Sequence, residues 1–230
     1  TPTSCPNIDQ ITNSWTTNLT VSLTGLTANN KYSFKIKARN QDDPVLYSDT
    51  ETSYYPSSGT ISVFTHIETP TTVTIAGTTS GKMVASSTDT FTNLTQGGLF
   101  LECVSVSGSD CTNVSPNDWF STALPKTITG LTPNSPYQFK LKARNGSTSG
   151  STPVYSFPSV ETASVTSSTK YSGIEDPSNI SASITGQSTA TLSTTDTFTN
   201  LASVSSGVLL TCATGTTPTT TACESSLPSS

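Results

Sequence analysis

The 230-residue chain predicts an all-β protein built from tandem β-sandwich modules. Two observations support this prediction. Val, Ile, Thr, Tyr and Phe occur in short runs that alternate with polar residues, which is typical of half-buried strands. Long stretches also recur: GLTANNKYSFKIKARN at 25–40 returns as GLTPNSPYQFKLKARN at 130–145. Self-similarity at a fixed spacing indicates a repeat architecture.

The repeat length sets the expected domain organisation. DTFTNL at 89–94 recurs at 196–201, an offset of 107 residues. This period predicts three parts: the C-terminal half of one module, a complete module, and the N-terminal half of a third, at 1–68, 69–175 and 176–230. Because a half module cannot bury its core alone, we expect adjoining sequence to complete it. That sequence is either the continuing chain or the next subunit of a head-to-tail assembly.

Strands are expected in the following order along the complete module. The candidate segments are TTVTIAG at 71–77, KMVASSTDTFTNL at 82–94, GGLFLECVSV at 97–106, KTITGL at 126–131, YQFKLKARN at 137–145 and VYSFPSVETASV at 154–165. SNISASITG at 178–186 repeats the first of them. Successive side chains of a strand point to opposite faces. The fifth segment therefore places its core face at Tyr137, Phe139, Leu141 and Ala143.

The stretch TITGLTPNSPYQFKLKARN, from Thr127, resembles a fibronectin type III domain of the immunoglobulin-like class. The similarity covers the end of one strand, a turn and the following strand, and the copy from Leu23 matches almost as well. It implies that Tyr32 and Tyr137 are tyrosine corners, whose hydroxyls tie the turn to nearby backbone. The chain departs from the family in three ways: its period is longer than usual, its cysteines are paired, and it lacks a clear Trp in the second strand (strand B). An immunoglobulin-like sandwich of another topology therefore stays open.

Cysteine spacing predicts local disulfides. Cys103 and Cys111 flank one short stretch rich in Ser, Thr and Gly, and Cys212 and Cys223 flank another. Cys5 is then expected to pair with a partner outside the chain. A zinc site is the alternative, but no Cys-x2-Cys spacing occurs and the single His is distant in sequence. Disulfides predict a secreted or cell-surface location.

No group of residues predicts catalysis, a cofactor or a metal site. No Ser or Cys around His66 is indicated as a paired nucleophile, and the aligned position in the next module is Gly173, so we expect no enzymatic activity. The acidic residues after the first repeated stretch could bind calcium or form a solvated loop: Asp42, Asp43, Asp49 and Glu51. A net charge of -5 gives no electrostatic basis for a nucleic-acid partner. No apolar run approaches the roughly 18 residues of a membrane span.

Other residues give candidate binding and modification sites. Trp15 and Trp119 are either sugar-stacking platforms or packing residues. Asn-x-Ser/Thr sequons mark candidate glycosylation positions at Asn18, Asn93, Asn113, Asn145 and Asn179. Basic residues recur on the face of the repeated strand that the core does not explain: Lys35, Lys37, Arg39, Lys140, Lys142 and Arg144. They either solubilise the sheet and pair across strands, for example with Glu102, or form an interaction face for an acidic neighbour.

The expected function is structural or adhesive: a repeat segment of a long extracellular surface or filament-forming protein, with modules stacked head to tail. Its expected partners are adjoining modules or copies of the same protein, with glycans as a further candidate. The alternative is a set of spacer or carbohydrate-binding modules from a secreted polysaccharide-degrading enzyme. Function must be argued from sites rather than from the fold.

Overall fold

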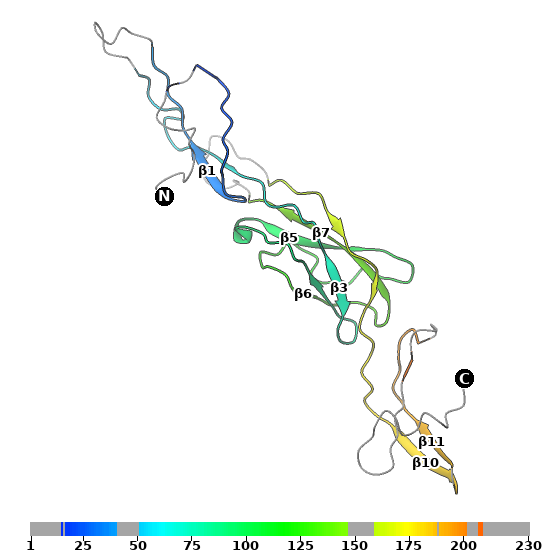
Figure 1. Ribbon diagram of the computed structural model, residues 1–230. Coiled ribbons are helices and arrows are strands. Elements are labelled where there is room, and N and C mark those ends of the chain that lie inside the picture. The colour runs from blue at the N-terminus through cyan, green and yellow to red at the C-terminus, as the bar shows by residue number, and fades with distance from the viewer. Residues whose placement is uncertain are drawn as a thin grey trace. The chain divides into compact units, whose positions relative to one another are not determined.

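The computed structural model describes residue 15 and residues 17–40, 51–146, 159–187, 189–201, 207 and 208. The chain divides into two compact units, residues 1–176 and 177–230. The described residues are strands and loops, with a single 3-10 turn at Leu94–Gln96 (Figure 1). This confirms the predicted all-β class.

The first unit begins with a two-stranded sheet, in the part that we name the N-terminal segment (residues 15–68). Strand β1 (Lys31–Phe34) pairs antiparallel with β2 (Ile61–Phe64). Isolated bridges extend this pairing from Ile36 to Tyr55 and from Arg39 to Glu51. The repeated sequence therefore continues to pair with the opposite segment beyond the end of β1.

The rest of the first unit, residues 69–176, is called the two-sheet segment. One sheet has the order β3-β4-β6 and is antiparallel, with strands Thr74–Gly77, Met83–Ser86 and Lys126–Ile128. The other joins β5-β7-β8, with β9 also pairing with β7; the bounds are Gly98–Val104, Pro136–Arg144, Val165–Thr166 and Lys170–Tyr171. The central strand, β7, is the repeated sequence (Figure 1).

The core of the two-sheet segment takes apolar side chains from both sheets. Strand β7 alternates without interruption, and its predicted core face is confirmed as fully buried: Tyr137, Phe139, Leu141 and Ala143. The other sheet contributes Ile75, Met83, Ala85 and Ile128 to the same cluster. Two antiparallel sheets that share one apolar core are consistent with a β-sandwich.

Two predicted strands are shorter than the sequence suggests. The segment at 82–94 leaves the sheet after Ser86 because the Asp89 carboxylate accepts hydrogen bonds from Thr71, Thr72 and Ser87. Partial burial opposes ionisation of this carboxyl, but these hydrogen bonds outweigh it and lower the pKa of Asp89. In the described part of the segment at 154–165, only Val165 lies in a named strand, and Glu161 forms an isolated bridge to Arg144.

The second unit contains one described hairpin. Strand β10 (Ser181–Gly186) pairs antiparallel with β11 (Thr189–Ser193), with an irregular register between Ile184 and Gly186. Asp196 repeats the arrangement of Asp89: hydrogen bonds from the Ser178 hydroxyl and the adjacent backbone lower the pKa of Asp196 to about 2. The matching sequences therefore form matching local structures.

Both repeated tyrosines hold the turn that precedes them. The Tyr137 hydroxyl accepts a hydrogen bond from the Thr132 backbone N–H at 2.8 Å, and the Tyr32 hydroxyl accepts one from the Thr27 N–H at 2.9 Å. The Tyr137 hydroxyl also donates to the Asp110 carbonyl at 3.4 Å. This is the kind of contact that the resemblance implies for a tyrosine corner.

Tyr137→Phe is expected to lower the free energy of unfolding by about 1 kcal/mol, because it leaves a partly buried backbone N–H without its acceptor. Lys140→Ala is the matched control, since Lys140 lies on the outer face of the same strand. Its loss should be much smaller. Equilibrium unfolding in urea measures both values, and equal losses would contradict the assignment of the two faces.

Candidate functional site

A buried asparagine connects the N-terminal segment to the two-sheet segment. Asn29 is fully buried in a left-handed turn conformation with φ of 46°. Its Nδ2 donates to the carbonyls of Asn93 at 2.7 Å and Thr92 at 3.3 Å. Its Oδ1 accepts from the Gly146 N–H at 2.8 Å. One side chain thus ties together stretches that lie up to 117 residues apart in sequence.

A second buried asparagine makes the reciprocal connection. Asn145 lies at the end of β7, and its Nδ2 donates to the carbonyls of Thr65 at 3.2 Å and Phe64 at 3.4 Å. Its Oδ1 accepts from the Val160 N–H at 2.6 Å. Each segment therefore places its backbone carbonyls against an amide of the other, and we call this arrangement the junction.

Further contacts complete the junction. The Glu68 carboxylate accepts hydrogen bonds from the backbone N–H and the hydroxyl of Thr92. Partial burial opposes its ionisation, but the bonds from Thr92 prevail and lower the pKa of Glu68. Asn93 Nδ2 donates to the Ala28 carbonyl at 3.2 Å. Among the described residues, no buried side-chain nitrogen or oxygen lacks a hydrogen-bond partner.

Gly146 allows the two segments to approach closely at the junction. A Cβ atom added there would lie 2.6 Å from the Gln96 carbonyl oxygen and 2.7 Å from the Phe64 ring. These separations are below van der Waals contact, so any larger residue would push the segments apart. A junction with all polar groups satisfied and closely packed apolar atoms favours one fixed arrangement.

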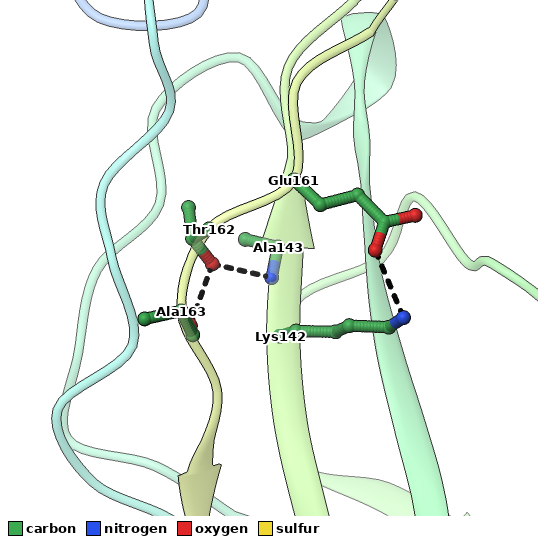
Figure 2. Close-up of polar contacts among 5 residues, drawn as sticks. All are labelled: Lys142, Ala143, Glu161, Thr162 and Ala163. Atoms are coloured by element: carbon green, nitrogen blue, oxygen red, sulfur yellow. Dashed lines mark hydrogen bonds and ion pairs between the residues drawn. The ribbon is translucent and has the colours of Figure 1, made fainter.

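The second feature is the outer face of β7. Lys142 Nζ forms an ion pair with Glu161 at 2.9 Å and lies 5.2 Å from the centre of the Phe100 ring. Figure 2 shows the lysine ammonium directed at this carboxylate. It also shows the Thr162 hydroxyl, which lies away from the ammonium and accepts from the Ala143 N–H at 3.0 Å. The basic residue thus meets an acidic residue and an aromatic ring of its own unit.

Trp119 lies against the same outer face of β7. The Arg144 guanidinium lies 4.3 Å from the centre of the Trp119 ring, and Lys142 lies 5.5 Å from it. Trp119 is half-buried and its ring also contacts Phe100, with centroids 5.5 Å apart. Cations over aromatic faces contribute about 0.5 to 1 kcal/mol each at exposed sites.

The N-terminal segment repeats this arrangement. Arg39 lies 4.5 Å from the centre of the Trp15 ring, and Lys37 lies 5.4 Å from the same ring. Lys37 also pairs with Glu51, whose hydrogen bond raises the pKa of the lysine, and it lies 5.2 Å from the Tyr54 ring. We call the two sets of Trp, Arg, Lys and Glu residues the cation–aromatic ladders.

The ladders change the interpretation of the sequence-predicted residues. Each Trp ring has cations of the chain itself over it, although Trp15 is 37% exposed, and these contacts favour packing over a sugar platform. Lys140 lies opposite Glu102 in the strand register, which confirms them as cross-strand neighbours. Lys35 is exposed. An interaction face for an acidic neighbour stays a prediction, since four of the six basic residues are already engaged within their own segments.

The structure places one predicted cysteine pair in contact. Cys103 and Cys111 form a disulfide, with Sγ atoms 1.99 Å apart and Cα atoms 5.8 Å apart. Cys5, Cys212 and Cys223 lie outside the described residues, as do the acidic positions 42, 43 and 49. His66 is exposed, and the described residues contain no group of three or more His, Cys, Asp or Glu side chains placed to hold a metal.

The candidate glycosylation positions differ in accessibility. Asn145 is buried and both polar atoms of its amide are engaged in the junction, so the folded chain has no room for a glycan there. The other four sequon asparagines are exposed: Asn18, Asn93, Asn113 and Asn179. Sequence reasoning missed the structural role of Asn145. The sequence did contain an indication of this role. Every second residue from 137 to 143 is on the buried face, and Asn145 is the next position in that alternation.

Comparison of the chain with protein-family models, with curated proteins and with solved structures gives no match. The similarity to fibronectin type III domains therefore stays a prediction. Within the described residues, no helix is long and apolar enough to span a bilayer.

Proposed function

We propose that the chain is a structural or adhesive segment of a long extracellular surface or filament-forming protein. Its units are fibronectin type III-like sandwiches stacked head to tail. The observation that carries this proposal is the junction, because it gives consecutive segments one defined orientation. A spacer or fibre needs such fixed geometry, whereas modules joined by a flexible linker would orient independently.

The strand order supports the fold part of the proposal. The two-sheet segment has sheets β3-β4-β6 and β5-β7-β8. In chain order these strands are candidates for A-B-E and C-F-G, the division found in immunoglobulin-like sandwiches. The hydroxyl-to-backbone contacts of Tyr32 and Tyr137 lie where that class carries its tyrosine corner.

The disulfide and the ladders support the proposed location and role. Disulfides form and persist mainly in oxidising compartments such as the cell exterior. The ladders use the basic residues and tryptophans for packing at equivalent positions of two consecutive segments. This argues against a carbohydrate-binding module, which would need the Trp15 and Trp119 faces open to sugars. The proposal assigns the chain no catalytic role, cofactor or metal.

The test compares the tumbling of the two segments by amide nitrogen relaxation in the full 230-residue chain. We expect residues 17–40 and 69–146 to share one rotational correlation time. Asn29→Ala should separate the two values, because it removes three hydrogen bonds across the junction. Asn30→Ala is the matched control, since Asn30 contacts Thr65 through its backbone N–H and carbonyl. Independent tumbling in the unaltered chain would overturn the proposal.

A further inference from the structure

Two described parts of the chain expose apolar residues whose sequence equivalents are buried. In the second unit, Ile180 is 61% exposed and Leu192 is 46% exposed. Their equivalents at the 107-residue offset, Val73 and Ala85, lie in the core of the two-sheet segment. Alternation places Ile180, Ala182, Ile184, Ala190 and Leu192 on one face of the β10–β11 hairpin. This face therefore has the apolar pattern of a core face, but Ile180 and Leu192 on it are exposed.

The N-terminal segment shows the complementary deficit. Ile36 is 68% exposed, whereas its equivalent Leu141 is fully buried. Residues 21–23 form no strand, although their equivalents 126–128 form β6 and pair with β4. Val21 is 48% exposed. The N-terminal segment therefore contains the sequence equivalents of β6, β7 and β9, and among the described residues no strand pairs with residues 21–23 as β4 pairs with β6.

We propose that the β10–β11 hairpin of one copy of this chain docks on the N-terminal segment of a second copy. The hairpin is the repeat equivalent of β3–β4, and these are the strands that cover the equivalents of Ile36 and Leu23 in the two-sheet segment. A second copy is the occupant whose sequence the chain itself contains. The proposal rests on the proposed function and identifies the partner in its head-to-tail stacking.

The known pairing of β4 with β6 fixes the register. Met83 faces Ile128, Val84 faces Thr127 and Ala85 faces Lys126. Transferred by the repeat offsets, these pairs become Ala190 with Leu23, Thr191 with Ser22 and Leu192 with Val21 of the second copy. In this arrangement β11 of one copy pairs with the backbone of residues 21–23 of the second copy. The apolar side chains of the hairpin then pack against the apolar side chains of the N-terminal segment.

Charge favours this docking as well. Residues 177–195 contain no charged side chain, so the hairpin can be buried without removing a charge from water. The basic residues of the N-terminal segment lie on its outer face, where Lys37 and Arg39 contact Trp15. The docking contact joins two different surfaces, the hairpin of one copy and the N-terminal segment of the next. Each copy can therefore bind one neighbour through its hairpin and another through its N-terminal segment, and the contact propagates as an open chain.

The first test is a disulfide cross-link between two variants that each carry one added cysteine. Mixing Ser22→Cys chains with Thr191→Cys chains under mild oxidation should give a dimer linked between these two positions, identified by peptide mass spectrometry. Ser183→Cys is the control, because Ser183 lies beside Thr191 on the same face but one strand farther from the predicted edge. The unaltered chain reports links made by native cysteines. Equal yields with Thr191→Cys and Ser183→Cys would overturn the proposal.

The second test is sedimentation of the full 230-residue chain over a range of concentrations. The chain should associate as concentration rises, and Leu192→Lys should weaken the association constant at least about tenfold, because a charge would enter the docked face. Ser183→Lys, on the hydroxyl-bearing face, should leave it nearly unchanged. A chain that stays monomeric at millimolar concentration overturns this inference. The proposed function would survive that result if the segments of the first unit still tumble together.

Discussion

Asn145→Ala is expected to lower the free energy of unfolding of the first unit by about 2 to 3 kcal/mol, because it removes three hydrogen bonds at a buried position. The carbonyls of Phe64 and Thr65 would face a small cavity instead of an amide. The Val160 N–H would lose its acceptor at 2.6 Å. Buried groups left without partners cost more than the net value of the bonds they had made.

Urea unfolding of the full chain measures this loss, and Asn113→Ala is the matched control. Asn113 is also a sequon asparagine, but it is exposed on a loop of the two-sheet segment. Its replacement should change the free energy of unfolding by less than about 0.5 kcal/mol. Similar losses for the two variants would show that the Asn145 amide does not hold the segments together.

Replacing Cys103 and Cys111 together by serine is expected to lower the free energy of unfolding by about 2.5 kcal/mol, the loop-closure value for a short disulfide loop. The two cysteines are eight positions apart in sequence and both pack against the core. The loop between them also carries the Asp110 carbonyl that the Tyr137 hydroxyl reaches. Without the disulfide, the unfolded chain gains freedom and the native loop loses an anchor.

As a control, the free energy of unfolding of the unaltered chain and of the double variant is measured with and without a reductant. The unaltered chain should lose stability when a reductant is added, whereas the double variant should show a smaller change. Tryptophan fluorescence is a suitable probe, because one of the two tryptophans, Trp119, lies in the same segment of the chain as the loop. A double variant as stable as the unaltered chain would contradict a stabilising role for the disulfide.

Local pattern was sufficient to predict the central strand. Residues 137–144 alternate strictly, and a period of two places Phe139 and Leu141 on one face whatever the rest of the chain does. The turn before it was predictable for the same reason, because its Tyr and its flanking residues lie within a few positions of one another. Side-chain direction in a regular strand depends on local geometry alone.

Contacts between distant residues were not predictable in this way. Trp119 and Arg144 are 25 positions apart, and nothing in either neighbourhood identifies the other as its partner. Asn29 and Gly146 are farther apart still. The early end of β4 was missed because Asp89 collects hydrogen bonds from Thr71 and Thr72, which compete with continuation of the strand. A local sequence pattern describes one segment of the chain, whereas each of these contacts depends on two segments that are distant in sequence.

The close approach at Gly146 limits how the repeats can be exchanged by recombination. The two repeated stretches end alike at Asn40 and Asn145, but Gln41 follows the first and Gly146 follows the second. A gene conversion that copied the first ending onto the second would place a glutamine Cβ 2.6 Å from the Gln96 carbonyl oxygen. Repeats that look interchangeable in sequence thus differ at the position that packs against the Phe64 ring of the neighbouring segment.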